Sequence, residues 1–219
     1  RLRTVTGVQT CALPICMDRD LKRLTFFWLI GLVVSGWNPY DRPTWWLEVL
    51  PAIVALPLLW WMRQWLPLSS LALGLILIHG LILMLGGAYT YARVPMGHWV
   101  QESFGLSRNP YDKLGHFAQG FVPAIVAREI LLRHFHLRRD ALLTFLVVCV
   151  CLAVSAAYEL LEWGVALALG QAADDFMGMQ GDPFDTQSDM FLALIGAVIA
   201  VVGLAGWHDR SMHQRVQRG

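Results

Sequence analysis

Six long apolar runs separated by short polar stretches dominate the chain. They cover residues 24–37, 45–61, 68–88, 114–132, 141–169 and 190–207. Most of them approach the ~20 residues that a helix needs to cross a bilayer. The first run is shorter, and we expect Leu21 to join it while Lys22 and Arg23 extend toward the headgroups. The pattern predicts an all-α fold, a polytopic integral membrane bundle of about six transmembrane helices.

The composition supports this prediction. Hydrophobic residues make up 56% of the chain, 15% of its residues are charged, and the mean hydropathy is +0.50. A soluble domain could not cover so much apolar surface. We therefore expect membrane lipids as partners and a single domain at residues 17–219. The net charge of +1 and the lack of a basic tract argue against a nucleic-acid partner. The oligomeric state is left open.

Residues 1–16, RLRTVTGVQTCALPIC, share no periodicity with the rest of the chain. They resemble the translated adapter read-through found at the ends of metagenomic gene models, and they lack the features of a signal peptide. We expect a non-native extension outside the fold. It contains Cys11 and Cys16. The other cysteines, Cys149 and Cys151, lie within an apolar run and are expected to pack as small apolar residues.

Lys and Arg residues are concentrated in alternate connections between the runs. If the chain starts in the cytoplasm, the cytoplasmic segments hold Arg19, Lys22, Arg23, Arg63, Arg133, Arg138, Arg139, Arg210, Arg215 and Arg218. The outer segments then hold Arg42, Arg93, Arg108 and, at the membrane edge, Lys113. Cytoplasmic loops carry an excess of these residues. The bias predicts that both termini lie in the cytoplasm.

The outer connection between residues 89 and 110 contains four apolar side chains, Met96, Trp99, Val100 and Phe104. Their spacing suits a short helix that lies in the membrane interface. An irregular loop with scattered aromatic residues accounts for them equally well.

Three charged runs, at residues 112–116, 158–162 and 182–189, lie at the ends of apolar segments. The topology places all of them on the outer side. Glu159, for example, is eighteen residues into the fifth span, ~27 Å from its cytoplasmic end. The expected outer cluster comprises Asp112, His116, Glu159, Glu162, Asp182, Asp185 and Asp189. The inner half is expected to carry little that ionises, only His79 and the pair Arg128 and Glu129, whose side chains can reach the inner interface.

Simpler explanations exist for each run. Asp112 could cap a helix above a buried, hydrogen-bonded His116, and residues 182–189 could form a turn and a capped helix. His79 could hydrogen-bond between helices. Glu159 and Glu162 are harder to explain in this way, because they repel each other and have no base within four residues.

The acids of the outer cluster outnumber the bases, so a divalent metal ion would neutralise the surplus charge. Carboxylates and an imidazole suit Mg²⁺, Mn²⁺ or Zn²⁺. The predicted metal ligands are His116, Glu162, Asp185 and Asp189. The predicted catalytic carboxylates are Asp112, Glu159 and Asp182. Substrate contacts are assigned to Lys113, Arg93, Arg108 and Gln119, with the three bases meeting an anionic headgroup.

Several longer motifs carry a family resemblance. LGGAYTYARVP, NPYDKLGHFAQGFVPAIVAREILLR, YELLEW and QGDPFDTQSDM resemble the YjdF family of bacterial inner-membrane proteins, over residues 37 to 209. The spacing of DK-x-x-HF, E-x-x-E and D-x-x-x-D is more distantly similar to the VanZ-like family, whose founder is linked to glycopeptide resistance. The resemblance implies a multi-pass protein of the bacterial inner membrane, but no established reaction.

Three functions fit these observations. The leading hypothesis is a metal-assisted hydrolase or transferase that acts on a lipid-linked envelope substrate. A proton- or cation-coupled transporter would use the same acids but needs polar groups through both leaflets. A non-catalytic scaffold would instead have dry acids, each paired with Arg or Lys.

Overall fold

The computed structural model describes residues 13–169 and 180–217. Over these ranges it has seven helices and no strand. The helices are α1 (Leu13–Trp37), α2 (Arg42–Met62), α3 (Ser70–Tyr89), α4 (Pro95–Phe104), α5 (Tyr111–Arg133), α6 (Ala141–Leu169) and α8 (Asp185–Gln217). The predicted all-α fold is confirmed. Within the predicted extension, residues 1–12 lie outside the described residues and residues 13–16 begin α1. Its non-native origin stays a prediction.

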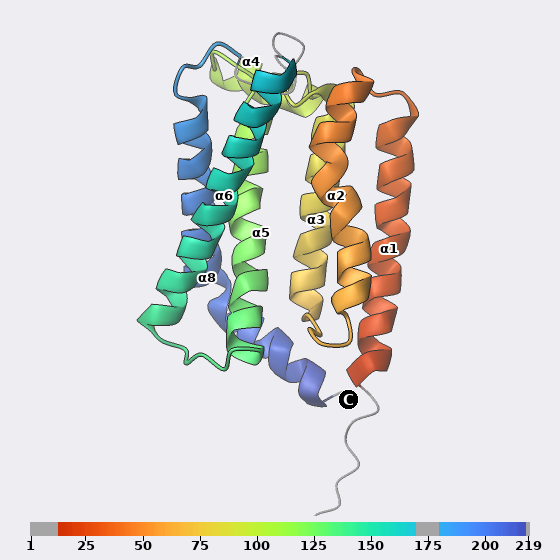
Figure 1. The fold of residues 1–219 in the computed structure, drawn as a ribbon, viewed down its shortest axis with the longest axis vertical. Helices are drawn as coiled ribbons and strands as arrows, with labels where there is room; N and C mark the ends of the chain where they lie inside the picture. The colour runs from red at the N-terminus through yellow and green to blue at the C-terminus, as the bar shows by residue number, and fades with distance from the viewer. Residues whose placement is uncertain (1–12, 170–179, 218–219) are drawn as a thin grey trace, which may run out of the picture.

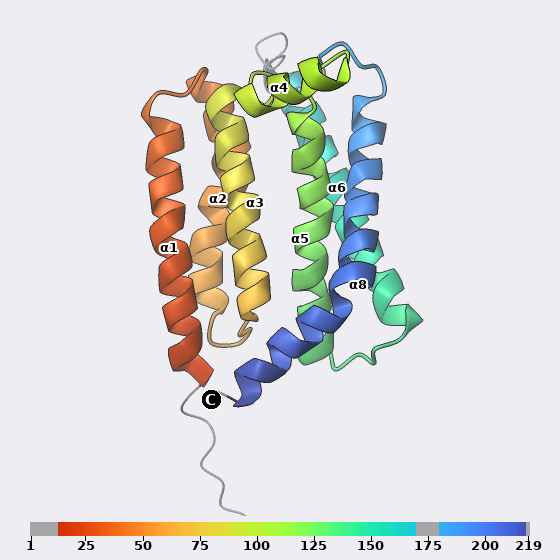
Figure 2. The ribbon, with the colours of Figure 1, turned by 180° about the vertical axis from the view of Figure 1, so that it is seen from behind.

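The long helices run side by side along the bundle, while α4 lies across one end (Figures 1 and 2). The start of α1 and the end of α8 lie at the opposite end, which we call the terminal end, in contrast to the α4 end. In the described part of the chain, four helices are long and apolar enough to cross a membrane: α2, α3, α6 and α8. Large apolar side chains such as Val34 and Val202 are exposed on the outside of the bundle. This exposure suits a surface that faces lipid.

Local signals define the helix ends. The carboxylate of Asp41 accepts a hydrogen bond from the backbone N–H of Thr44 at the start of α2, and the hydroxyl of Ser69 accepts one from Ala72 N–H at the start of α3. Helix α4 begins at Pro95 and ends at Gly105, whose positive φ of 62° suits glycine. The short-helix alternative for the outer connection is therefore confirmed.

Helix α5 packs closely against α8, and two glycines allow this approach. A Cβ atom at Gly120 would overlap the carbonyl oxygen of Ala193, and one at Gly196 would overlap the carbonyl oxygen of Phe117. Because the two backbones nearly touch, polar side chains near the start of α8 lie beside those near the start of α5. This contact positions the candidate site.

Candidate functional site

The three charged runs meet at the α4 end of the bundle, where α5, α6 and α8 lie together. We give the name α4-end cluster to six of their polar residues: Asp112, Lys113, His116, Glu159, Asp185 and Asp189. Their acids are buried, with residue exposures between 2% for Asp189 and 8% for Asp112. Carboxylates buried this deeply need a base, a proton or a metal ion.

His116 is the centre of one half of this cluster. Its Nε2 atom lies 3.5 Å from Asp112 Oδ1 and 3.7 Å from Asp189 Oδ2. Its Nδ1 atom lies 3.0 Å from Gln119 Oε1 and 3.6 Å from Glu159 Oε1. Asp112, His116 and Asp189 each offer one potential ligand atom, and these three atoms lie within 4.8 Å of one another. The helices α5 and α8 thus present two carboxylates and an imidazole to a common point.

Two carboxylate oxygens of this half lack hydrogen-bond partners among the described residues. They are Asp112 Oδ2 and Glu159 Oε1, and both atoms are inaccessible to solvent. A buried acceptor without a donor costs about 1–3 kcal/mol, and more when it is charged. Such atoms indicate one of two things: the fold tolerates an unfavourable interaction there, or a hydrogen-bond donor or cation binds at the site.

Bases neutralise the other half of the cluster. Lys113 Nζ donates to Asp185 Oδ1 and to Asp189 Oδ1, at 2.8 Å in each case, and also contacts Ser188 Oγ. Arg108 donates to Asp185 Oδ1 at 2.6 Å, and its second terminal nitrogen lies 3.7 Å from Asp182 Oδ2. Asp189 therefore joins the two halves, because one of its oxygens faces Lys113 and the other faces His116.

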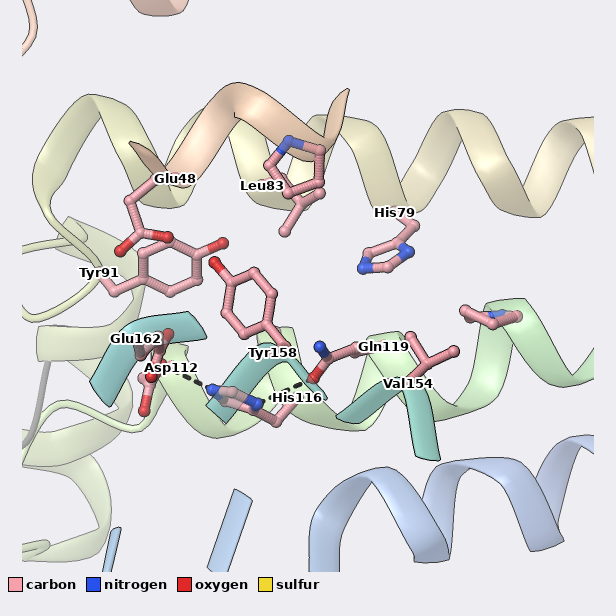
Figure 3. A pocket seen from close by; sticks show the side chains of 13 residues that line it. Glu48, His79, Leu83, Tyr91, Asp112, His116, Gln119, Val154, Tyr158 and Glu162 are labelled. Carbon is pink, nitrogen blue, oxygen red and sulfur yellow. Dashed lines mark hydrogen bonds and ion pairs between the residues drawn. The ribbon is translucent and has the colours of Figure 1, made fainter. Parts of the chain in front are cut away.

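A cavity of about 180 Å³ opens beside His116 (Figure 3). Its carboxylates come from three helices: Glu48 on α2, Asp112 on α5 and Glu162 on α6. Gly115 and Pro123 also line the cavity from α5. The cavity therefore lies between the α2–α3 pair and the α5–α6 pair, at the α4 end.

Aromatic and neutral polar side chains complete the cavity wall: Tyr91, Tyr158, His79 and Gln119. The rings of Tyr158 and His116 are 6.4 Å apart, edge to face. Burial raises the pKa of Tyr91, on the connection between α3 and α4, above its usual range. Its phenol therefore stays protonated.

The structure separates some of the residues that the sequence analysis grouped. Glu162 lines the cavity rather than the Asp112–His116–Asp189 group, whereas Asp185 is held by bases. Asp182 precedes α8, whereas Asp185 and Asp189 lie one turn apart on it. The guanidinium of Arg93 lies over the ring of Tyr40, 4.1 Å from its centroid.

Four ionisable lining residues were absent from the predicted site: Glu48, His79, Tyr91 and Tyr158. Glu48 had a signal, because it is an acid near the start of an apolar span and is only 5% exposed in the fold. Tyr158 directly precedes Glu159. The expected hydrogen bond from His79 is not made at Nε2, which has no partner within the described ranges.

The terminal end, which the loop charges assign to the cytoplasmic side, carries more ionisable residues than expected. At the terminal end lies a second network, the terminal-end cluster, formed by Arg128, Glu129, Arg133, His208 and Asp209. Glu129 and His208 are each 0% exposed and Arg128 is 4% exposed, so their side chains do not reach out to the interface. The sequence hid this network because its helices, α5 and α8, are distant along the chain.

The terminal-end cluster is fully connected. Glu129 Oε1 accepts from Ser69 N–H at 2.8 Å and pairs with Arg133 Nε at 3.0 Å. Glu129 Oε2 accepts from the Ser69 hydroxyl at 2.7 Å and lies 3.1 Å from His208 Nε2. Arg128 then links His208 Nδ1 to Asp209, at 3.0 and 2.9 Å.

Comparisons with known proteins give a consistent picture. Residues 21–210 match the family described as "Predicted membrane protein (DUF2238)". The inner membrane protein YjdF of Escherichia coli (strain K12) is 55% identical over 201 residues, which cover 92% of this chain and 94% of that protein. No solved structure matches the chain. The resemblance to the YjdF family is confirmed, and the more distant VanZ-like resemblance stays a prediction.

These relatives and the apolar helices agree on the location of the protein. It is a multi-pass helical protein of the bacterial inner membrane, as the sequence predicted.

Proposed function

The chain belongs to the DUF2238 family of predicted membrane proteins, and we propose that it is a metal-assisted hydrolase or transferase that acts on a lipid-linked envelope substrate. The single observation that supports this function most strongly is the grouping of Asp112, His116 and Asp189 within 4.8 Å. Ligands of this kind suit Mn²⁺, Zn²⁺ or Mg²⁺.

The residues around this group have the placement that metal-assisted chemistry needs. A bound divalent ion would supply an activated water and polarise the substrate. Glu159, whose Oε1 lies 3.6 Å from His116 Nδ1 and has no hydrogen-bond partner among the described residues, would accept a proton from that water. The neighbouring cavity would hold the headgroup.

The proposal includes a topology of six spans with both termini in the cytoplasm. The connection 62–70, which holds Arg63, and the connection 133–141, which holds three Arg residues, lie at the terminal end, together with the start of α1 and the end of α8. The excess of Lys and Arg in cytoplasmic loops would then direct the α4 end, and with it the candidate site, to the outer leaflet.

A transporter remains the second candidate, since the cavity extends to His79 in the middle of α3. Beyond the cavity, however, side chains such as Ile125, Val147 and Ala197 are 0% exposed and apolar. They separate the cavity from the terminal-end cluster. A transport path needs polar groups or water through this layer, so the geometry favours chemistry at one leaflet.

A scaffold would explain only the half of the cluster that contains bases. Lys113 and Arg108 pair with Asp185, as a scaffold requires. Asp112 Oδ2 and Glu159 Oε1 have no hydrogen-bond donor within the described residues, and the base that faces both acids is the imidazole of His116, at 3.5 and 3.6 Å. Polar groups retained only to join helices would be hydrogen-bonded.

Metal analysis of the purified full-length protein tests the proposal. We expect about one Mn²⁺ or Zn²⁺ per chain, lost in Asp189→Asn and retained in Glu102→Gln, a matched change on the exposed face of α4. Glu159→Gln should retain the ion and lose turnover of bacterial polar lipid extract, followed by mass spectrometry. A protein without metal, whose lipid profile is unchanged by Glu159→Gln, would contradict the proposal.

A further inference from the structure

The cavity beside His116 is lined by three acids and two histidines, with no Lys or Arg from the described residues. The three carboxylates are those of Glu48, Asp112 and Glu162. A cavity of this kind repels an anionic group and attracts a cationic one.

The bases expected to meet an anionic headgroup are engaged elsewhere. Lys113 and Arg108 bind Asp185 from the far side of the cluster, and Arg93 covers the ring of Tyr40. Since these bases lie outside the cavity wall, no Lys or Arg of the described residues could meet a phosphate inside the cavity.

One buried acceptor in the wall requires a donor. Asp112 is 8% exposed, its side chain lines the cavity, and its Oδ2 atom has no hydrogen-bond partner in the described part of the chain. In Figure 3, Asp112 and Glu162 lie close together, with Glu48 and Tyr91 on the opposite wall. A single donor group between the two walls could reach several of these oxygens.

The phenols of Tyr91 and Tyr158 line the cavity together with these carboxylates and suit the same type of ligand (Figure 3). Aromatic faces attract ammonium groups, an interaction that strengthens when the site excludes water. The volume of about 180 Å³ is several times that of one water molecule, whose share of the liquid is about 30 Å³. A compact headgroup fits this space.

We propose that this cavity binds the ammonium group of a small organic amine, held by Glu48 and Glu162 and by the rings of Tyr91 and Tyr158. The inference rests on the proposed function and deepens it. It names a zwitterionic amine headgroup as the part of the substrate that lies beside the metal ligands. The amine is either the headgroup of an aminophospholipid or a free amine. Both present the same ammonium chemistry to the cavity.

Binding measurements on the full-length protein in a non-ionic detergent test this inference. Ethanolamine and choline are titrated in the presence of EDTA, beside 3,3-dimethyl-1-butanol, the uncharged isostere of choline. Ethanolamine supplies N–H donors to the buried carboxylate oxygens, whereas choline has none and tests the effect of the positive charge alone. We expect the amines to raise the thermal unfolding temperature and the isostere to leave it unchanged. Glu48→Gln and Glu162→Gln should each weaken amine binding about tenfold or more, while the exposed Glu102→Gln should not.

A lipid arm identifies the source of the amine. The protein is extracted from vesicles of equimolar phosphatidylethanolamine and phosphatidylglycerol, and the retained lipid is identified by native mass spectrometry. Retention of phosphatidylethanolamine that is lost in Glu162→Gln supports a lipid headgroup, and binding of the free amines alone supports a soluble amine.

The inference is overturned if neither source binds, or if the isostere binds as tightly as choline. Because EDTA is present, a protein without a metal site can still bind the amine. A metal-binding protein that ignores the amine would disprove this inference alone. Glu162 is partly exposed, so Glu162→Gln keeps the test decisive if Glu48→Gln does not fold.

Discussion

The two polar clusters of the bundle both join α5 to α8, with α6 adding Glu159 to the α4-end cluster, and their buried charges are compensated to different degrees. In the terminal-end cluster, both carboxylate oxygens of Glu129 have partners, and His208 and Arg128 continue the network. In the α4-end cluster, Asp112 and Glu159 each keep an oxygen without a partner among the described residues. Of these two clusters, only the α4-end cluster borders the cavity.

This difference separates a structural role from a functional one. Breaking a fully paired buried network leaves uncompensated charges and is strongly unfavourable. Removing a charge that has no partner relieves its desolvation cost. Polar groups kept at such a cost are typical of binding and catalytic sites. The predictions below test whether the two clusters behave in these two ways.

The largest effect is expected for Glu129→Ala. The change leaves His208, Arg133 and the backbone N–H of Ser69 without their shared carboxylate, so we expect a loss of about 3–5 kcal/mol in the free energy of unfolding. Unfolding in SDS, followed by circular dichroism, measures it. Asp112 has one partner, His116 at 3.5 Å, and one oxygen without a hydrogen bond among the described residues, so Asp112→Ala should cost clearly less than Glu129→Ala, about 1 kcal/mol. Equal losses in the two variants would remove the distinction between the clusters.

A smaller loss is expected when the base is removed from the paired half of the α4-end cluster. Lys113→Met leaves Asp185 and Asp189 without the ammonium group that both accept from. The free energy of unfolding should fall by about 1.5–3 kcal/mol. Added Mn²⁺ should restore part of this loss, because a cation can now neutralise both acids. No loss, or no response to Mn²⁺, would show that Lys113 is not the neutralising group.

Close packing of α5 on α8 is needed to hold Asp189 beside His116, and Gly120→Ala tests it. The new methyl group would overlap the Ala193 carbonyl, so the helices must separate, at about 1–3 kcal/mol. Metal binding should weaken together with stability. Gly203→Ala, on α8 with no heavy atom within 4 Å of an added Cβ, is the control and should be neutral or slightly stabilising. Unchanged metal affinity in Gly120→Ala would show that the site does not depend on this contact.

The fold was predictable because bilayer thickness imposes helix length. The runs 141–169 and 45–61 differ from α6 and α2 by few residues, since apolar length and turn residues such as Asp41 decide both ends. The gathering of acids at one end was predictable for the same reason, because alternate helix ends meet at one side of the bundle.

The partners within each cluster were not predictable. Whether Lys113 meets a substrate or Asp189 depends on the rotation of α8 against α5, which the glycine contacts at Gly120 and Gly196 determine. The partners Glu129 and His208 are 79 residues apart. His208 next to Trp207 resembles any interfacial pair, so local pattern carries no information about that contact.

The smallest effect is expected at the edge of the terminal-end cluster, where Arg139 pairs with Asp209 at 3.2 Å. The Arg139 side chain is 51% exposed, whereas that of Arg128, on the same carboxylate oxygen, is 5% exposed. An exposed ion pair is screened by water and restricts a long side chain, so Arg139→Gln should cost less than about 1 kcal/mol. Chemical denaturation of Arg139→Gln and Arg128→Gln compares the two losses in free energy of unfolding. Arg128→Gln also removes a contact to buried His208. If Arg139→Gln costs as much as Arg128→Gln, then the stability of this cluster comes from its total charge rather than from buried pairing, and the contrast with the α4-end cluster would need a different physical basis.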